Sequence, residues 1–316
     1  MTAPLTNPFP AGSKVLYPDL WADRKETLST LRRAFDIAFR SAEPMVIQVR
    51  GDYGFGKTHT LRYIEHVVRE GEWNKTKGFP IFVDNPGTDH LDFFNSFLSA
   101  AKMDTLLSSL KEMLAQIMLS KSAKLQKTMM EGETSADAVV SDLNPLTLST
   151  DLRRELVELF KGTGFSLRGT SISDYWEHLS KALSMLPLGG DNQFSAAKWL
   201  TFQKLYKYDR DLLEIPDNQA SPGYVAATIV AIVRLIAHAR NYPKVVLLID
   251  ELEAIVGSSG RDNLAQCFRQ LVDSGLPELI IVLGTSISAD EVFVGTQALI
   301  RRIHMTVELT QLTPSD

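Results

Sequence analysis

Five short apolar segments stand out along the chain, and amphipathic stretches separate them. They occupy residues 45–50, 79–84, 244–250, 279–284 and 305–309. Apolar runs of this length are typical of strands buried on both faces, and strands that alternate with helices indicate a parallel sheet. We therefore predict an α/β fold with a five-stranded parallel sheet flanked by helices.

Helical spacing of apolar positions fills most of the remaining chain. Pro44 is expected to end the first helix and Gly71 the second. The stretch 131–150 is polar and is predicted to be a mobile loop. The predicted helices cover residues 19–40, 58–70, 195–205, 224–239 and 261–274.

This pattern divides the chain into four parts. Residues 1–44 form an N-terminal arm and helix, and residues 45–87 carry the first two strands. Residues 88–240 are a large, mostly helical insertion. Residues 241–316 return to alternating strands and helices and complete the sheet.

Composition narrows the class of protein. Apolar residues make up 44% of the chain and charged residues 22%, which is typical of a soluble globular protein. The absence of a continuous apolar run of membrane-spanning length and of a secretory signal predicts a cytoplasmic protein without a membrane span. The single cysteine, Cys267, excludes an internal disulfide and is expected to pack inside a helix. A net charge of −5 neither requires nor excludes nucleic acid, so any such contact would depend on a local patch.

The segment after the first predicted strand matches the phosphate-binding pattern G-x-x-x-x-G-K-[ST] in full. Its glycines allow the backbone N–H groups to converge on phosphate oxygens, and the following helix contributes its positive end. Lys57 is expected to neutralise the β and γ phosphates, and the Thr58 hydroxyl to bind Mg²⁺. We therefore predict a site for ATP and Mg²⁺ formed by Gly51, Asp52, Tyr53, Gly54, Phe55, Gly56, Lys57, Thr58 and His59.

Two carboxylates follow the third strand, at the edge of the sheet where ligands bind in such folds. Asp250 is expected to hold Mg²⁺, directly or through its water. Glu251 is expected to orient and polarise the attacking water in phosphoryl transfer. Glu253 lies nearby but is interpreted as an acidic residue at a helix start.

With the loop after the first strand and Asp250-Glu251 after the third, the chain resembles the AAA+ ATPases, in particular the initiator-like group of origin-recognition proteins and transposition regulators. The resemblance implies a polar residue after the fourth strand that senses the γ-phosphate, Thr285 first and Ser286 second. It also implies an arginine before the fifth strand that reaches a neighbouring subunit. Arg302 is the first choice for that role and Arg301 the second, against the alternative of an exposed helix arginine.

The same resemblance suggests three further features. Asn85 matches a polar position that restrains the catalytic glutamate, although Asn-Pro-Gly is also an ordinary turn. The segment from Asn7 to Arg24 resembles the part that packs against adenine, the alternative being a simple arm. The sequence stops at Asp316, where such proteins begin a helical lid, so the lid is expected to be missing. Residues 196–200 and the helix leading into Asp250 also resemble, more loosely, the ATP-binding protein of BREX-type phage-defence systems.

Two functions of different classes remain open. The first is an oligomeric ATPase, associated with double-stranded DNA and with other defence or transposition proteins. The second is an ATP-gated assembly switch that recruits a partner protein without working on DNA. A small-molecule kinase is disfavoured because no acceptor-binding acid can be named. A basic stripe of Lys121, Lys124 and Lys127 is a candidate contact for DNA, the alternative being a solvated helix face. An aromatic cluster of Phe93, Phe94 and Phe97 is a candidate contact for a partner protein, the alternative being core packing.

Overall fold

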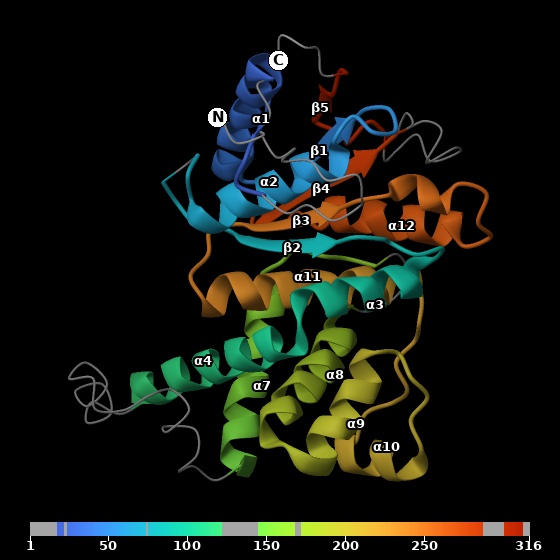
Figure 1. The fold of residues 1–316 in the computed structure, drawn as a ribbon. Helices are drawn as coiled ribbons and strands as arrows, with labels where there is room; N and C mark the ends of the chain where they lie inside the picture. The colour runs from blue at the N-terminus through green and yellow to red at the C-terminus, as the bar shows by residue number, and fades with distance from the viewer. Residues whose placement is uncertain are drawn as a thin grey trace, which may run out of the picture. The chain divides into compact units, whose positions relative to one another are not determined.

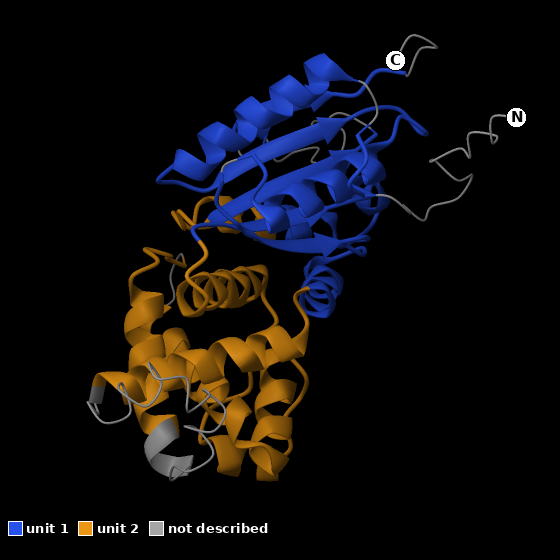
Figure 2. Ribbon diagram, turned by 60° about the vertical axis from the view of Figure 1, so that its left-hand side comes forward, with its two compact units in different colours: residues 1–100, 243–265, 279–316 blue, residues 101–242, 266–278 orange. Residues whose placement is uncertain are grey.

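The computed structural model describes residues 18–21, 24–73, 75–121, 145–167, 172–286 and 300–311 (Figure 1). The chain divides into two compact units (Figure 2). Unit 1 contains residues 1–100, 243–265 and 279–316, and unit 2 contains residues 101–242 and 266–278.

Unit 1 is built around a five-stranded sheet with the order β2-β3-β4-β1-β5. All four strand pairings are parallel, as the sequence predicts, so the carboxyl ends of the strands lie along one edge. The strands are β1 Met45–Arg50, β2 Phe79–Val83, β3 Val245–Ile249, β4 Leu279–Thr285 and β5 Met305–Glu308. The order places β4 between β1, which leads into the glycine-rich loop, and β3, which leads into Asp250.

Two helices cover one face of this sheet. They are α1 (Lys25–Arg40) and α2 (Lys57–Glu70), and their buried residues join alternate strand residues in one hydrophobic core. Burial of this apolar face supplies most of the stabilisation of such a layered fold. α2 ends at Gly71, which adopts the left-handed conformation expected of a helix-terminating glycine.

The first helix is shorter than predicted. Helical structure begins at Lys25, not Asp19, and Leu20 is exposed rather than part of the helix face. Pro18 and Asp19 form a turn instead, because a few apolar positions at helical spacing cannot continue a helix without burial of their side chains.

The aromatic cluster Phe93, Phe94 and Phe97 belongs to the protein interior. All three lie on α3 (His90–Ala101) and are fully buried, with the rings of Phe94 and Phe97 stacked. The suggestion that this cluster docks a partner protein is therefore wrong. The alternative of core packing is confirmed.

Unit 2 is helical in the part that the structure describes. Its helices include α4 (Met103–Lys121), α7 (Pro145–Lys161), α8 (Ile172–Met185), α9 (Gly190–Leu200), α10 (Lys207–Leu213) and α11 (Pro222–Ala239). A short 3-10 helix, η1 (Leu186–Leu188), precedes α9. The last predicted helix of the core, α12 (Arg261–Val272), begins in unit 1 and ends in unit 2.

Two expectations about unit 2 need correction. Residues 145–150 belong to α7, so the polar stretch does not extend as a loop to Thr150, while residues 131–144 lie outside the described residues. The helix predicted at 195–205 runs from Gly190 to Leu200, since Thr201 and Phe202 turn the chain. Lys124 and Lys127 of the basic stripe, and the side chain of Lys121, lie outside the described residues.

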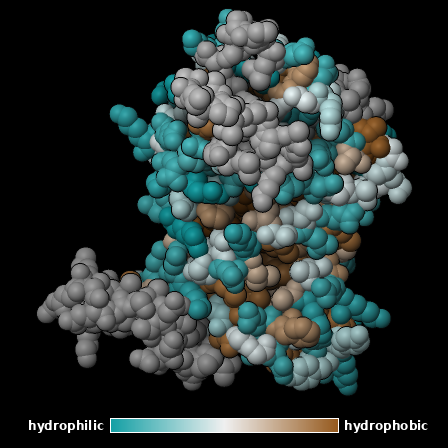
Figure 3. Space-filling view, viewed as in Figure 1, coloured by the Kyte–Doolittle hydropathy of each residue, from teal (hydrophilic) through white to brown (hydrophobic). Residues whose placement is uncertain are grey.

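α11 is long and apolar enough to cross a membrane by length and composition. However, 78% of its apolar window is buried inside the protein. Its Thr228 hydroxyl also hydrogen-bonds the Tyr175 hydroxyl of α8 at 2.6 Å. These contacts identify α11 as a core helix of unit 2. The face drawn in Figure 3 shows hydrophilic residues over much of the described surface.

Candidate active site

The glycine-rich loop connects β1 to α2 at the carboxyl edge of the sheet. Gly54 and Gly56 both have φ of +84°, a left-handed conformation that glycine adopts without strain. Gly56 is the N-cap of α2 and has no side chain that could cap the first-turn amides, which lie at the loop end of the helix. Tyr53 at the tip is 97% exposed. The loop therefore presents backbone donors and a helix N-terminus together, as anion-binding loops do.

Lys57, the first residue of α2, folds its ammonium group back over this loop. Its Nζ donates hydrogen bonds to the carbonyl oxygens of Gly51 at 2.9 Å and Asp52 at 3.2 Å. The charge thus lies at the centre of the loop, where it can neutralise phosphate oxygens.

The segment before α1 anchors the loop from outside. The Arg24 guanidinium donates a 2.8 Å hydrogen bond from Nη1 to the Phe55 carbonyl. A His59 ring nitrogen lies 2.6 Å from the Leu20 carbonyl oxygen. Leu20 and Arg24 thus contact the start of α2 and the loop, whereas residues 7–17, 22 and 23 of the predicted adenine-contacting segment lie outside the described residues.

Asp250 follows β3 directly and is only 3% exposed. The Thr58 hydroxyl and the Glu251 backbone N–H both donate hydrogen bonds to its carboxylate. Burial raises the pKa of Asp250 and the Glu253 charge adds to this, whereas the Thr58 and Glu251 hydrogen bonds and the Lys57 charge lower it. A buried carboxylate is costly unless a cation or hydrogen bonds compensate it, so this position favours a cation.

Glu251 is exposed and has φ +51° and ψ +38°. This left-handed conformation is uncommon for a residue with a side chain and turns the chain sharply away from β3. Five other described non-glycine residues also have positive φ, so the conformation alone does not mark a site. Glu251 directly follows Asp250 and is exposed, so its carboxylate is accessible to water.

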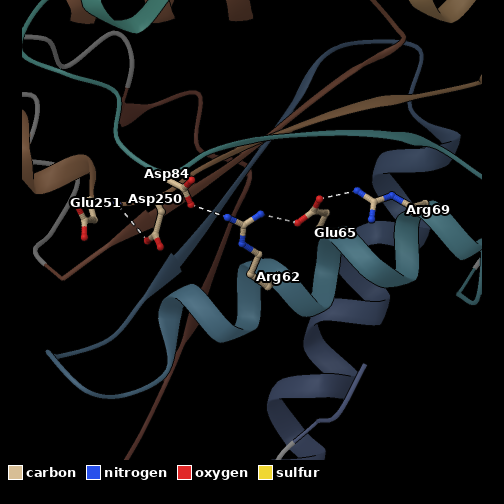
Figure 4. A network of polar contacts seen from close by, with 6 residues as sticks. All are labelled: Arg62, Glu65, Arg69, Asp84, Asp250 and Glu251. Carbon is tan, nitrogen blue, oxygen red and sulfur yellow. Dashed lines mark hydrogen bonds and ion pairs between the residues drawn. The ribbon is translucent and has the colours of Figure 1, made fainter. Parts of the chain in front are cut away.

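A second carboxylate lies beside Asp250 (Figure 4). Asp84 follows β2, and the pairing of Val83 with Ile249 places it next to Asp250. Arg62 of α2 reaches Asp84 at 2.6 Å and Glu65 at 2.9 Å, with its guanidinium over the Phe82 ring. Arg62 therefore neutralises Asp84 and leaves Asp250 as the buried acid of this edge.

The end of β4 completes the row of strand ends. Gly284 lies against Asp250: a Cβ there would come within 3.0 Å of Asp250 Oδ1 and 2.7 Å of Leu61 Cδ1. The Thr285 side chain is 0% exposed, and its carbonyl accepts a hydrogen bond from the Gly51 N–H at 3.3 Å. Ser286, the next residue, is partly exposed. Of the two candidates for sensing phosphate, Ser286 is therefore the better placed.

The structure adds Glu253 to the site, which the sequence interpretation set aside as a helix-start acid. Glu253 lies on the 3-10 helix η2 (Leu252–Ile255), and its carboxylate accepts the Ser286 hydroxyl at 2.6 Å and the Ser286 N–H at 3.3 Å. Its sequence signal was the acidic residue three positions after Asp250, but the partner on β4 became visible only in the fold.

The remaining candidates are placed as follows. Asn85 accepts the Gly87 N–H at 2.7 Å through its side-chain oxygen, the geometry of an ordinary turn. Arg301 is exposed and Arg302 half-buried in the turn before β5. The structure contains a single chain, so the action of either arginine on a neighbouring subunit stays a prediction.

The residues present fit a nucleoside triphosphate and a magnesium ion. The ammonium group, the helix N-terminus and the left-handed glycines match a polyphosphate. Among the described residues, no group of three His, Cys, Asp or Glu side chains could hold a metal. Thr58 with Asp250 is nonetheless a suitable pair, because Mg²⁺ is usually held by one or two protein oxygens together with waters and substrate phosphates.

Comparison of the chain with protein-family models, with curated proteins and with solved structures found no match. The candidate site therefore rests on its own geometry.

Proposed function

We propose that the chain binds ATP with Mg²⁺ at the loop 51–58 and hydrolyses it. The observation that carries this proposal is the closeness of Thr58 to the buried Asp250, whose pKa the Thr58 side chain lowers. Thr58 is the second residue of α2, and Asp250 directly follows β3, far away in sequence. Two oxygen groups of the type Mg²⁺ prefers thus meet beside a loop suited to phosphate.

In this proposal the phosphates bind to loop residues that the fold already holds in place. The amides at the start of α2 and the Lys57 ammonium bind the phosphate oxygens, while Arg24 holds the loop through the Phe55 carbonyl. Bound Mg²⁺, held by Thr58 and Asp250, would polarise the phosphoryl group and offset the charge that develops on it. Glu251 orients the attacking water and accepts its proton.

The proposal for how the chain assembles rests on the resemblance to the AAA+ ATPases. The five-stranded parallel sheet, with the loop after β1 and the acids after β3, supports a P-loop ATPase core. We propose that the chain forms homo-oligomers in which Arg302, or Arg301, reaches a neighbouring site. An arginine supplied in this way is worth about 10³- to 10⁵-fold in rate.

The biological setting follows from the resemblance alone. We propose an oligomeric ATPase associated with double-stranded DNA, in phage defence or mobile-element biology. The alternative, an ATP-gated assembly switch, loses the Phe93, Phe94 and Phe97 docking surface, since those side chains are buried. The net charge of −5 still supports this alternative, because an acidic protein is less suited to binding DNA.

The decisive experiment measures ATPase rate per subunit against protein concentration, with and without double-stranded DNA. Lys57→Ala should remove nucleotide binding, and Glu251→Gln should keep binding but lower turnover at least 100-fold. A rate that rises with concentration and with DNA supports the DNA-stimulated oligomer. Turnover that is indifferent to both supports the assembly switch, and wild-type protein that does not bind ATP overturns the proposal altogether.

A further inference from the structure

Three large aromatic side chains are exposed on unit 2, where α9 and α10 lie side by side (Figure 1). Phe194 of α9 is 62% exposed, and Tyr206 and Tyr208, at the start of α10, are 70% and 59% exposed. Among the described residues, the only other aromatic side chain so exposed is Tyr53 in the glycine-rich loop. Single exposed apolar side chains are ordinary, but a group of exposed rings indicates an interaction surface.

The three rings are grouped around one ammonium group. Lys198 Nζ lies 4.4 Å from the centre of the Phe194 ring and 5.2 Å from that of the Tyr206 ring, within the range of a cation–π contact. Asp191, Phe194 and Lys198 recur at helical spacing on one face of α9. Asp191 also accepts a 2.8 Å hydrogen bond from the Tyr208 hydroxyl. The rings and Lys198 therefore form one continuous surface, the α9–α10 surface.

A buried carboxylate holds this surface in place from beneath. Asp209 of α10 accepts hydrogen bonds from Lys198 Nζ at 3.1 Å and from the Ser195 hydroxyl at 2.6 Å, both on α9. The Lys198 ammonium is thus compensated and fixed between the two rings. Side chains that are ordered before a ligand arrives lose little conformational freedom when it binds.

The sequence around the rings is basic, although the whole protein has a net charge of −5. Residues 192–208 contain three lysines, Lys198, Lys204 and Lys207, and no carboxylate. Lys198 is neutralised by Asp209. Lys204 and Lys207 are exposed and take part in no ion pair within the part of the chain that the structure describes. Uncompensated ammonium groups beside exposed rings suit a ligand that carries phosphates and flat bases.

We propose that the α9–α10 surface binds single-stranded DNA. Bases stack on the rings of Phe194 and Tyr206, and backbone phosphates bind Lys204 and Lys207. Every base presents a flat face, so this recognition does not depend on sequence, and neither contact requires the 2′-hydroxyl of RNA. A duplex keeps its bases stacked within the helix and cannot use the rings. Asp191 makes its own end of the surface less suited to a phosphate.

This inference goes beyond the proposed function, because the α9–α10 surface lies wholly in unit 2 and its binding requires no nucleotide. The test is the Kd of the full-length chain for a fluorescein-labelled oligothymidylate of about 20 nucleotides, long enough to cover a typical binding site. Fluorescence anisotropy is measured without nucleotide at a series of salt concentrations. A duplex and an oligouridylate of the same length and a proline-rich peptide are the comparison ligands.

The variants separate ring stacking from apolar contact and from charge. Tyr206→Phe keeps a ring, whereas Tyr206→Leu keeps an apolar side chain without one. Phe194→Ala removes the other ring at an exposed helix position, where alanine is favourable. A double variant, Lys204→Gln with Lys207→Gln, removes the two uncompensated charges.

Two controls lie away from the α9–α10 surface. Ile37→Ala removes an exposed apolar side chain of α1 in unit 1. Lys161→Gln removes an exposed lysine of α7 that pairs with Glu158. Neither should change the Kd for the oligothymidylate. Thermal melting shows whether each variant is folded.

We expect Tyr206→Leu and Phe194→Ala each to raise the Kd at least about fivefold, the lower end of the effect of one stacked base. Tyr206→Phe should stay within about twofold of the wild type, since it keeps the stacking face. The slope of log affinity against log salt should lose about 1.4 in magnitude in the double lysine variant, because each phosphate contact on a single strand contributes about 0.7. Any binding of the duplex should not respond to Tyr206→Leu.

Four results would overturn the proposal. The first is a Kd for the oligothymidylate that neither ring variant changes, and the second is an equal loss of duplex binding in these variants. The third is binding of the oligouridylate more than about tenfold tighter, which makes RNA the ligand. The fourth is a proline-rich peptide that binds through the same rings when the oligothymidylate does not bind. Failure to bind or hydrolyse ATP overturns only the proposed function, because no nucleotide is present in this test.

Discussion

The guanidinium of Arg24 donates a 2.8 Å hydrogen bond to the carbonyl oxygen of Phe55, inside the glycine-rich loop. The residue before the first helix thereby fixes a loop that comes after the first strand. A loop with two left-handed glycines loses much conformational freedom when it orders around a ligand, and an anchor that orders it in advance reduces that loss.

Removal of this anchor should weaken nucleotide binding without abolishing it. We expect Arg24→Ala to raise the Kd for ATP about 10- to 150-fold, which corresponds to about 1.5–3 kcal/mol for one hydrogen bond to a charged group. Arg24→Lys keeps the charge but not the planar guanidinium, so its Kd for ATP should lie between those of the wild type and Arg24→Ala. Isothermal titration calorimetry checks this, and an unchanged Kd for Arg24→Ala would show that the loop orders without the anchor.

A methyl group at Gly284 should disrupt the site from within the sheet. The added Cβ would lie 3.0 Å from Asp250 Oδ1 and 2.7 Å from Leu61 Cδ1, so one of these side chains must move. We expect Gly284→Ala to lower the free energy of unfolding by about 1–3 kcal/mol and to weaken Mg²⁺-dependent nucleotide binding.

Urea unfolding and nucleotide titrations with and without Mg²⁺ measure both effects. Gly164→Ala offers a comparison in unit 2: its positive φ of +70° makes alanine strained, but no atom lies within 4 Å of the added Cβ. It should cost stability without altering Mg²⁺ dependence. Equal Mg²⁺ dependence in both variants would contradict the expected displacement of Asp250.

Asp209 should contribute stability to unit 2 that depends on pH. The Ser195 hydroxyl at 2.6 Å, together with the Tyr206 N–H and the Lys198 ammonium, lowers the pKa of this buried carboxyl. A carboxyl with a lowered folded pKa stabilises the protein above the unfolded value of about 3.9, and this contribution disappears as pH falls through the folded pKa.

We therefore expect Asp209→Asn to cost about 1–3 kcal/mol of unfolding free energy at pH 7. The difference from wild type should shrink as pH falls below about 4. Urea unfolding at a series of pH values tests this. A difference that stays constant down to pH 3 would mean that packing, not the charge, is what the variant loses.

Cys267 should be chemically silent in the folded protein. It is fully buried in α12, and burial raises the pKa of its thiol, so little reactive thiolate forms at neutral pH. We expect a thiol reagent such as DTNB to react only as the chain unfolds. Fast reaction with the native protein would show that the end of α12 opens locally.

The sequence alone determined the elements whose signals are local. Apolar runs identified all five strands within two residues, because strands of a parallel sheet are buried on both faces and leave little room for polar residues. The loop 51–58 and the pair Asp250-Glu251 followed from strand ends and short motifs. Local signals failed where burial decides, as in the start of α1 at Lys25 and the bounds of α9.

Only the tertiary structure decided which of these elements meet. Strand order is set by the packing of helices on the sheet, and it places β4 between β1 and β3, so that Gly284 touches Asp250 and Ser286 reaches Glu253. Thr285 remains in the strand and is buried, whereas Ser286 is the first residue beyond it, a distinction of one position that no sequence pattern resolves. The contacts of Arg24 with Phe55 and of Thr58 with Asp250 depend on the same long-range packing, because residues distant in sequence meet only when the core that holds them has formed.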